Sequence, residues 1–314
     1  MNQGWVYFDR VRGDDVGLTL LEFYTQRYAH SGLADWQSRI EGGQVLINGI
    51  SVSAETPLQV GQKLSYHRPP WQEPEVPLAF EVLYEDSDLL VVAKPSGLPV
   101  LPGGGFLENT LLHQLRSLYP QETPVPIHRL GRGTSGLMLL ARSPLAKSNL
   151  SQQMRKSTAG GGPLVHSHRP IHKTYRALVS AGDMPDQQTI RQPIGKIAHE
   201  QLGYIFGAAD DGQFARSDVH VVRRDAETTL VEVTIFTGRP HQIRIHLATI
   251  GFPLVGDPLY VAGGIPRIFS VEGDMKQPVP GDCGYALHAY RLAFAHPRSQ
   301  EAMSFECPPP ANLC

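Results

Sequence analysis

The chain has 314 residues, 41% of them hydrophobic, and a formal net charge of −2 at pH 7. This length suggests about two domains, and the hydrophobic fraction excludes a globally disordered chain. No run of about 18 apolar residues is present, so we expect no membrane span. The first residues also lack the apolar segment of a secretion signal.

The small net charge hides an uneven distribution along the chain. Residues 123–182 contain nine Lys and Arg and no Asp or Glu, whereas the rest of the chain has 19 Lys and Arg against 30 Asp and Glu. Such a basic segment indicates a local anion-binding surface. The three cysteines, Cys283, Cys307 and Cys314, have neither disulfide-scaffold nor metal-ligand spacing. We therefore expect no metal site and a reducing, cytoplasmic environment.

The first unit is predicted to run from about Gly17 to Tyr66. The segment LTLLEFYTQRYAHSG has the apolar spacing of a helix, and a second short helix is expected over Asp35–Glu41 with Asp35 as N-cap. In QVLINGISVS, the pair Asn48-Gly49 is a strong signal for a hairpin between two strands. The segment QKLSYH predicts one more strand.

A proline-rich segment then divides the chain. Residues His67–Pro77 include four prolines, which are incompatible with regular structure and indicate a semi-rigid linker. We therefore assign residues 1–68 to a small N-terminal module, 69–77 to the linker and 78–314 to a larger domain.

The larger domain mixes strands and helices. Strands are expected in FEVLYEDSDLLVVA, GLMLLA, TYRALVS, DVHVV, TTLVEVTIF and His288–Phe294. Helices are expected in ENTLLHQLRSLY, in SPLAKSNLSQQMRK with Ser143 as N-cap, and in RPHQIRIHLATIG. Residues 158–170 and 261–284, rich in Gly and Pro, predict loops. This order indicates an α+β domain rather than a doubly wound one.

Three segments could carry chemistry. HRLGRGTSGLMLLA places arginines and glycines before an apolar strand, as in a site that approaches an anion closely, although an ordinary surface turn has the same composition. GRPHQIRIH gathers Arg239, His241 and Arg244 without an acid, although a solvated helix start would do the same. In HKTYRALV, alternation places Lys173 and Tyr175 on one strand face, where a core role for the tyrosine is the simpler interpretation.

Together these segments resemble the RNA pseudouridine synthases of the large-subunit ribosomal (RluA-like) type. YEDSDLLVVAKPSGLPV is similar to the opening strand motif of that family, HRLGRGTSGLMLLA to its catalytic loop and HKTYRALV to its tyrosine motif. GRPHQIRIHL with GFPLVGDPLY, and then HAYRLAFAHP, match its later motifs in the same order. The N-terminal module resembles the alpha-L RNA-binding module of the S-four type.

The resemblance implies a catalytic domain with a mixed, largely antiparallel sheet and flanking helices. It also implies an enzyme that isomerises uridine to pseudouridine in structured ribosomal or transfer RNA, with no cofactor and no metal. We expect a monomer, which suits a protein that must wrap folded RNA, and no membrane partner. Members use a carboxylate as nucleophile on a flipped-out uridine. By the resemblance, Tyr175 packs against the base, Arg244 pairs with the nucleophile and Leu292 lines the pocket floor. Binding of RNA is expected from Arg129, Arg132, Thr134, Ser135, Lys173, Arg239 and His241.

One position departs from the family pattern. The catalytic loop of the family reads HRLD, but the fourth residue here is Gly131, so the nucleophilic aspartate is missing. Two interpretations follow from this difference. Another carboxylate, such as Asp257 or an acid from an insertion, replaces the aspartate in space, or the chain is a catalytically impaired RNA-binding pseudoenzyme of the same fold.

Overall fold

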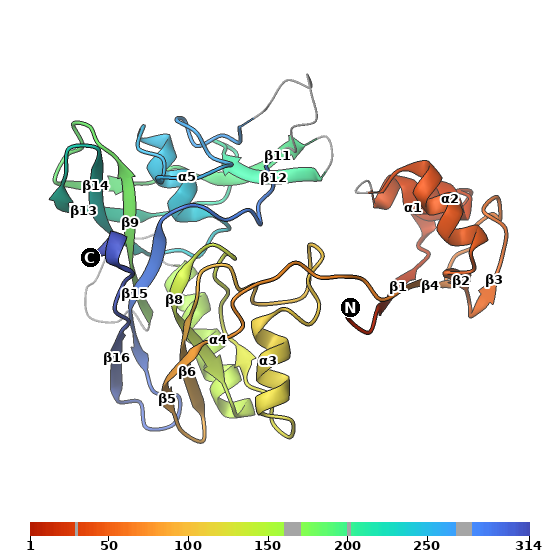
Figure 1. Cartoon of the computed structure of the whole chain (residues 1–314), viewed down its shortest axis with the longest axis horizontal. Coiled ribbons are helices and arrows are strands. Elements are labelled where there is room, and N and C mark those ends of the chain that lie inside the picture. The colour runs from red at the N-terminus through yellow and green to blue at the C-terminus, as the bar shows by residue number, and fades with distance from the viewer. Residues whose placement is uncertain (29–30, 160–170, 200–201, 268–277) are drawn as a thin grey trace. The chain divides into compact units, whose positions relative to one another are not determined.

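The computed structural model describes residues 1–28, 31–159, 171–199, 202–267 and 278–314. Two compact units are distinguished (Figure 1). One comprises Met1–Glu73 together with Ala198–Tyr204, and the other comprises Pro74–Ile197 and Ile205–Cys314. Residues 69–80, which contain the prolines of the predicted linker, form neither helix nor strand. The loop predicted at 158–170 lies almost entirely outside the described residues, as does part of the loop predicted at 261–284.

The N-terminal unit packs two helices against a small sheet. Its helices are α1 (Leu20–Arg27) and α2 (Leu33–Glu41), and its sheet has the order β1-β4-β2-β3. The strands are β1 (Trp5–Arg10), β2 (Val45–Ile47), β3 (Ile50–Ser51) and β4 (Lys63–Arg68). A short 3-10 turn, Gly13–Asp15, follows β1. Trp36 and Tyr24, both about 1% exposed, lie at the centre of its core.

Two details of this unit differ from the sequence predictions. Strand β1 lies before the predicted start at Gly17. It was not predicted, because its exposed aromatic residues lack the alternation of a half-buried strand. The N-cap of α2 is Gly32 and not Asp35, whose carboxylate accepts the N–H of Gly32 at 3.0 Å from the first turn. The hairpin at Asn48-Gly49 is confirmed, since both residues have the positive φ that a tight turn of this kind requires.

The larger unit is built on one mixed sheet. Its main path is β10-β13-β14-β9-β15-β8-β6-β5, with β16 paired to β15 and β7 paired to β8. Every pairing in it is antiparallel except β15 with β8. The strands are β5 (Glu81–Glu85), β6 (Leu89–Lys94), β7 (Val125–Pro126), β8 (Ser135–Ala141), β9 (Ile171–Ser180), β10 (Gln187–Ile190), β13 (Ser217–Arg224), β14 (Thr228–Ile235), β15 (Leu287–Ala295) and β16 (Ala302–Glu306). The predicted α+β class with a largely antiparallel sheet is confirmed.

Helices and the base of a short hairpin, whose tip at Ala198–Tyr204 is counted with the other unit, complete the larger unit. The helices are α3 (Leu111–Leu118), α4 (Pro144–Ala159) and α5 (Gln242–Thr249), and the hairpin is formed by β11 (Ile194–His199) and β12 (Gly203–Ala208). Ser143 caps α4 as predicted, because its Oγ accepts the N–H of Ala146 at 3.1 Å. A 3-10 turn, Ala311–Leu313, ends the chain. No helix is long and apolar enough to cross a membrane in the part of the chain that the structure describes.

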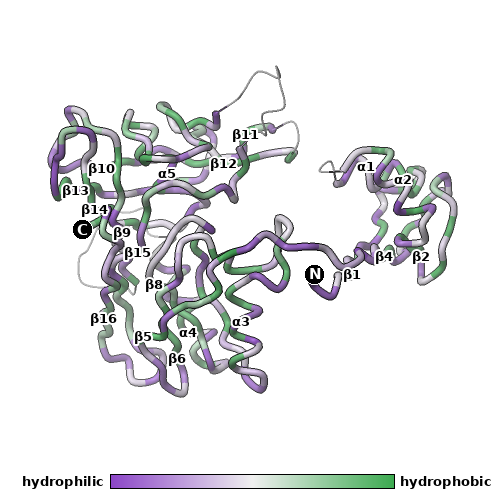
Figure 2. The backbone as a smooth tube through the Cα atoms, in the orientation of Figure 1, coloured by the Kyte–Doolittle hydropathy of each residue, from purple (hydrophilic) through white to green (hydrophobic). Residues whose placement is uncertain are grey.

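Strand β8 is the centre of the core. All seven of its residues are buried, and the hydropathy colouring in Figure 2 shows hydrophobic and hydrophilic residues mixed along the strands of the sheet. Gly136 at its start has φ +102°, and a Cβ there would lie 2.3 Å from the carbonyl oxygen of Ala289 on β15. This close parallel pairing sets His288 beside Ser135. The residues that precede β8 and those that precede β15 therefore meet at the same edge of the sheet.

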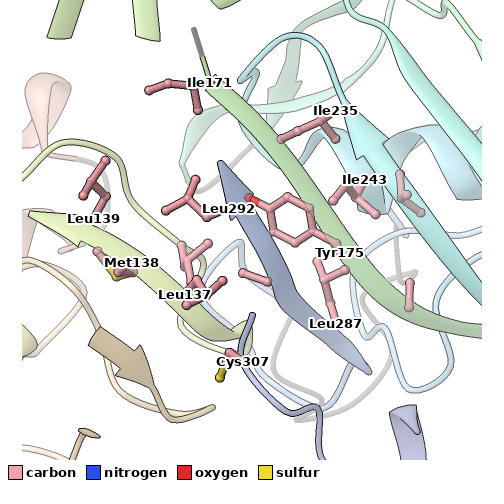
Figure 3. Packing of buried hydrophobic residues seen from close by; sticks show 14 of the residues in the cluster. Leu137, Met138, Leu139, Ile171, Tyr175, Ile235, Ile243, Leu287, Leu292 and Cys307 are labelled. Atoms are coloured by element: carbon pink, nitrogen blue, oxygen red, sulfur yellow. The ribbon is translucent and has the colours of Figure 1, made fainter. Parts of the chain in front are cut away.

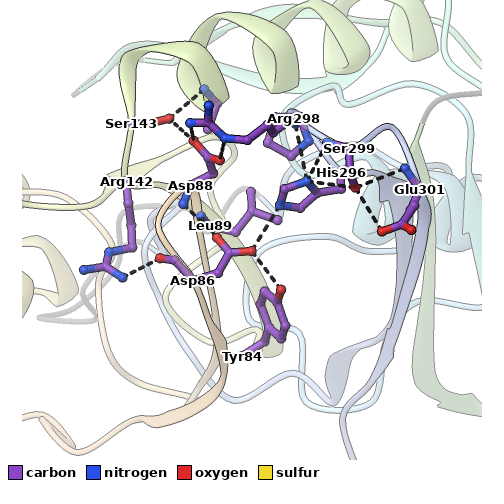
Figure 4. Close-up of polar contacts among 12 residues, drawn as sticks. Tyr84, Asp86, Asp88, Leu89, Arg142, Ser143, His296, Arg298, Ser299 and Glu301 are labelled. Atoms are coloured by element: carbon purple, nitrogen blue, oxygen red, sulfur yellow. Dashed lines mark hydrogen bonds and ion pairs between the residues drawn. The ribbon is translucent and has the colours of Figure 1, made fainter.

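A polar network fixes the other end of these strands (Figure 4). The Asp88 carboxylate accepts hydrogen bonds from Arg298, at 2.6 and 2.9 Å, and from Ser143 at 2.5 Å, and these bonds lower its pKa to about 2. Asp86 accepts from Tyr84 at 2.7 Å and lies 3.0 Å from His296. The network links the β5–β6 turn to the start of α4 and to the turn after β15. It holds the sheet at the end opposite to the basic loop that precedes β8.

Candidate active site

A cavity of about 340 Å³ lies where the loop before β8, strand β9, the start of α5 and the segment before β15 converge. Its volume is within the range of small-ligand sites. The cavity is lined by Ile127, His128, Arg129, Leu130, Gly131, Thr134, Met154, Lys173, Tyr175, Ile235, Gly238, Arg239, His241, Gln242, Ile243, Arg244, Tyr285 and Leu287. The structure thus brings together residues from all three segments that the sequence singled out.

The loop before β8 is held by hydrogen bonds from the end of strand β6 and from the turn after it. The N–H of Thr134 donates to the carbonyl of Gly131 at 3.0 Å, which closes a turn over residues 131–134. Lys94, 1% exposed, donates to the carbonyls of Pro95, Leu98 and Arg132 at 2.8, 2.9 and 3.2 Å. Burial lowers the pKa of Lys94 to about 7. This lysine acts on the site by holding the loop in place.

Arg244 has its carboxylate partner on the side away from the cavity. Its Nε and Nη2 each donate to Asp257 at 2.7 Å, and the two side chains are 3% and 1% exposed. The Asp257 carboxylate also accepts the N–H groups of Leu259 and Tyr260 at 2.9 and 3.0 Å. Four donors use the lone pairs that a carboxylate offers, and Asp257 does not line the cavity. The arrangement therefore assigns Asp257 a structural role and gives no support to its replacing the missing nucleophile.

Tyr285 occupies the place where a side chain at position 131 would begin. A Cβ built on Gly131 would lie 2.6 Å from the Tyr285 hydroxyl oxygen, and one built on Gly133 would lie 2.9 Å from its Cζ. The ring stacks on the Arg244 guanidinium, whose Cζ is 4.2 Å from the ring centroid. The hydroxyl is 3.3 Å from Thr134 Oγ1, and the residue is only 5% exposed. The two glycines of the loop thus leave room for one tyrosine.

Strand β9 contributes Tyr175 and Lys173, which share a face as predicted. Tyr175 is 7% exposed, and burial raises the pKa of its hydroxyl well above the usual range, so the group stays protonated at neutral pH. That direction favours packing against a ligand over proton removal. Burial lowers the pKa of Lys173 to about 8, and its Nζ lies 3.9 Å from the sulfur of Met154.

Three more predicted binding residues line the cavity with different degrees of freedom. Arg129 is exposed at the rim. The Arg239 guanidinium donates to the Phe214 carbonyl at 2.9 Å and to Gln213 Oε1 at 2.8 Å, so its head is fixed. His241 has φ +54° as the N-cap of α5, and burial lowers its pKa to about 3.

The hydrogen bonds around His241 also indicate its tautomer. Its Nδ1 is 2.7 Å from the Tyr260 hydroxyl, which donates to the Phe206 carbonyl at 2.7 Å. Because that hydroxyl has a single proton to donate, Nδ1 of the neutral ring carries the proton. The other nitrogen, Nε2, is then the acceptor.

Three residues of the predicted site do not line the cavity. Arg132 turns its Nε to the carbonyl of Gly281 at 2.7 Å. Ser135 is buried with its Oγ 2.9 Å from His288 Nδ1, because the parallel pairing of β8 and β15 places the two residues side by side. Leu292, expected on the pocket floor, is 2% exposed and belongs to the main core cluster (Figure 3). It lies opposite Lys173 of β9, beyond a register shift of β15 between Ala289 and Arg291, whereas Leu287, opposite Ala177, lines the cavity.

Only some of the basic residues in the acid-free segment 123–182 contribute to the charge of the cavity. Arg142 and Arg176 of that segment pair with Glu85 and Glu232 at 2.8 and 2.9 Å. By contrast, the described cavity lining includes Arg129, Lys173 and Arg239 and contains no Asp or Glu. Within the ranges that the structure describes, no group of three or more His, Cys, Asp and Glu side chains could hold a metal ion. The cavity is thus a positively charged and partly aromatic site.

Sequence analysis missed Tyr285, Leu287, Gln242 and Lys94. Tyr285 lies directly after the predicted loop at 261–284 and before the predicted strand that starts at His288, so no pattern singled it out. Gln242 is 4% exposed, and its Oε1 accepts from Thr237 Oγ1 at 2.7 Å, which orders the start of α5. Of these four residues, only Lys94 could have been found from the sequence. A charged residue that directly continues the apolar strand LLVVA is expected to be buried and therefore to have hydrogen-bond partners.

Comparison with known proteins identifies the family. Residues 88–249 match the family model described as RNA pseudouridylate synthase. A relative from Synechocystis, named as an uncharacterized RNA pseudouridine synthase, is 47% identical over 94% of this chain and 95% of its own length. A ribosomal large subunit pseudouridine synthase D from Neisseria meningitidis is 34% identical over 91% of this chain and 73% of its own. Among solved structures, human RNA pseudouridylate synthase domain containing 1 aligns with a TM-score of 0.54 and 23% identity, over 76% of this chain and 86% of that one.

Proposed function

Because the chain belongs to the RNA pseudouridine synthase family and is an isomerase of that family, we propose that it converts a uridine of structured ribosomal or transfer RNA into pseudouridine. The observation that carries this proposal is the cavity around Tyr175. It combines a buried tyrosine, four Lys and Arg side chains and a lining without described acids. The name of the Neisseria relative supports ribosomal RNA as the first substrate to test.

The size and lining of the cavity suit a single flipped nucleotide. An enzyme that acts on a base must first take it out of the stack, and it then holds the base between apolar or aromatic side chains. We assign this contact to Tyr175, whose protonated hydroxyl lies at the end of a ring packed in the core. Thr134 and His241 supply hydrogen-bonding groups from two other sides.

The basic residues are assigned to the RNA backbone. Arg129 at the rim is free to reach into the helix that the uridine leaves, whereas Lys173 and the fixed Arg239 are placed to meet phosphate or uracil oxygens. Contacts of this kind dominate RNA affinity and weaken with salt. Uridine and pseudouridine are isomers, so the proposed reaction uses no cofactor and no metal. Action as a monomer in the cytoplasm is also part of the proposal.

The N-terminal unit is proposed to add a second, less specific RNA contact. Strand β1 is at the edge of its sheet and exposes Trp5, Tyr7 and Phe8, which are 49%, 42% and 76% exposed. Arg10, Arg12 and Lys63 lie in a shallow depression beside Phe8. Exposed aromatic rings next to basic side chains are typical of surfaces that bind unpaired nucleotides.

Release of tritium tests the proposed activity. Unmodified ribosomal and transfer RNAs transcribed with uridine labelled at C5 are incubated with the full chain, because the label is lost when C5 becomes bonded to the ribose. We expect release that saturates at one or a few uridines per RNA, and mapping of the modified positions then identifies the target. RNA binding without release from either RNA class would contradict the proposal and leave only a binding function.

A further inference from the structure

We propose that Tyr285 is the nucleophile of this enzyme, acting from the position that the family aspartate would occupy. This inference rests on the function proposed above and deepens it, since it names a catalytic residue that the sequence motifs do not contain. Three observations place the hydroxyl: the clash with any side chain at residue 131, the contact with Arg244, and its place in the cavity lining.

The geometry is that of a substitution in space. An aspartate at 131 would project its carboxylate from a Cβ that the Tyr285 hydroxyl oxygen now approaches to 2.6 Å. The family pattern pairs that carboxylate with the arginine found here as Arg244, and the guanidinium of Arg244 stacks on the Tyr285 ring instead. The carboxylate oxygen expected from an aspartate at position 131 is thus replaced by the hydroxyl oxygen of Tyr285, which comes from the segment before β15.

Two further glycines indicate that Tyr285 has replaced the aspartate, and that the aspartate was not simply lost. Gly133, two residues beyond the missing aspartate, would also clash with the ring if it carried a Cβ, at 2.9 Å from Cζ and 3.0 Å from Cε1. On the other side, Gly256 has φ +76°, and a Cβ there would lie 2.3 Å from the carbonyl of Gly284, directly before the tyrosine. Small residues on both flanks allow this ring to enter the site.

Tyrosine is a competent nucleophile at a sugar carbon. Some glycosidases use a tyrosine in place of the usual carboxylate at the same kind of carbon, and tyrosine forms covalent intermediates in other enzymes. Burial raises the pKa of Tyr285, while Arg244 and the hydrogen bond with Thr134 oppose that rise. The hydroxyl must therefore lose its proton to solvent before it reacts.

The proposed steps balance without a further reactant. The phenolate oxygen attacks C1′ of the ribose, the C1′–N1 bond breaks and uracil leaves with the electron pair, next to the cationic Lys173. After the base turns, C5 attacks C1′ and the bond from C1′ to the tyrosine oxygen breaks. The C5 proton returns to the phenolate, and N1 takes a proton from solvent, which replaces the one given up at the start. The product is an isomer of the substrate, and Tyr285 is restored.

The test compares four variants of the full chain with the wild type in the tritium assay. Tyr285→Phe removes one oxygen and keeps the ring on Arg244. Tyr290→Phe makes the same change on β15 outside the cavity. A double variant, Gly131→Asp with Tyr285→Ala, restores a carboxylate and removes the clashing ring. A fourth form, Glu272→Gln with Asp274→Asn, removes the two acids of residues 268–277, which lie outside the described part of the chain.

We expect Tyr285→Phe to lower kcat by at least about 1,000-fold with little change in KM or in RNA affinity, as for the loss of a nucleophile. Tyr290→Phe should stay within about threefold of the wild type, since it leaves every described cavity group in place. The same is expected of the Glu272 and Asp274 variant, because the proposal assigns the nucleophile to Tyr285. The wild-type rate should rise with pH through the neutral and mildly alkaline range as the phenolate fraction grows. The double variant should lack this rise, because its nucleophile is a carboxylate, and any loss of activity from deprotonation of Lys173 affects both forms alike.

The outcomes separate this proposal from the one on which it rests. Wild-type activity that survives in Tyr285→Phe would overturn the role of Tyr285 and leave the proposed function intact. The role of Tyr285 is overturned in the same way if activity is lost only when Glu272 and Asp274 are changed, or if the wild-type rate does not depend on pH. Silence of the wild type on every RNA would overturn the proposed function, and the role of Tyr285 with it.

Discussion

The cavity of the larger unit and the exposed face of β1 both combine basic and aromatic side chains, but they hold them differently. In the cavity, Arg244 is 3% exposed with a bidentate partner, and Tyr175 is 7% exposed. On β1, Phe8 is 76% exposed, and Arg27 at the end of α1, which pairs with Asp9 of β1 at 3.6 Å, keeps 37% of its side chain in solvent. A fixed arrangement suits discrimination of one nucleotide, whereas a solvated one suits adjustable contact with an RNA backbone. Substitutions in each region test this difference.

The largest effect is expected from the buried ion pair. Asp257→Asn should lower the free energy of unfolding by about 3–5 kcal/mol, because it leaves the Arg244 charge buried without its counter-charge. The matched change in the N-terminal unit, Asp9→Asn, leaves the Arg27 side chain 37% exposed to solvent and an amide oxygen that can still accept from Tyr28, so it should cost only about 1 kcal/mol. Urea unfolding of each variant measures both values. Equal losses would show that the two regions do not differ in the way described.

The next effect concerns the space at residue 131. Gly131→Ala should cost about 1–3 kcal/mol, because its Cβ forces the Tyr285 hydroxyl out of a packed position. The same change in a Tyr285→Phe background should cost clearly less, since the clashing oxygen is absent. A double-mutant cycle by thermal unfolding measures this coupling. Strict additivity would mean that the two residues do not compete for the same space.

A pH effect on RNA binding is expected from Lys173. Its pKa of about 8 is lowered by burial, so the ammonium is present below that pH and is lost as the pH rises through it. RNA affinity should therefore fall as the pH passes from neutral to mildly alkaline. Lys173→Met should bind RNA more weakly at neutral pH and show a flatter pH dependence. Fluorescence anisotropy with a labelled RNA at constant salt makes the comparison, and unchanged pH dependence in the variant would exclude a phosphate contact by this residue.

The smallest effect is expected beside β1. Arg12→Gln should reduce the slope of log affinity against log salt by about 1 and weaken binding similarly for all RNA sequences, as for one lost phosphate contact. Arg223→Gln, an exposed arginine on β13 away from the cavity, is the control. If the two variants have the same salt slope as the wild type, the surface beside β1 does not contact the RNA backbone.

Much of the fold could be predicted from local patterns. Asn48-Gly49 indicated the hairpin, Ser143 indicated the start of α4, and the apolar run GLMLLA indicated the buried strand β8. In each case neighbouring residues supply the physical cause, either a turn that needs positive φ, a side-chain cap or continuous burial. Strand β1 escaped because its exposed aromatic residues break that kind of pattern.

The sequence by itself determined the family motifs, the position of Tyr175 on its strand and the absence of an acid at residue 131. Only the tertiary structure decided what stands in that place. The parallel pairing of β8 with β15 brings Tyr285, from a distant part of the chain, against Gly131. The tertiary structure also shows that the Asp257 carboxylate accepts hydrogen bonds from Arg244 and from two backbone N–H groups. Local sequence records which side chains are available, but contact between distant segments decides which oxygen faces the cavity.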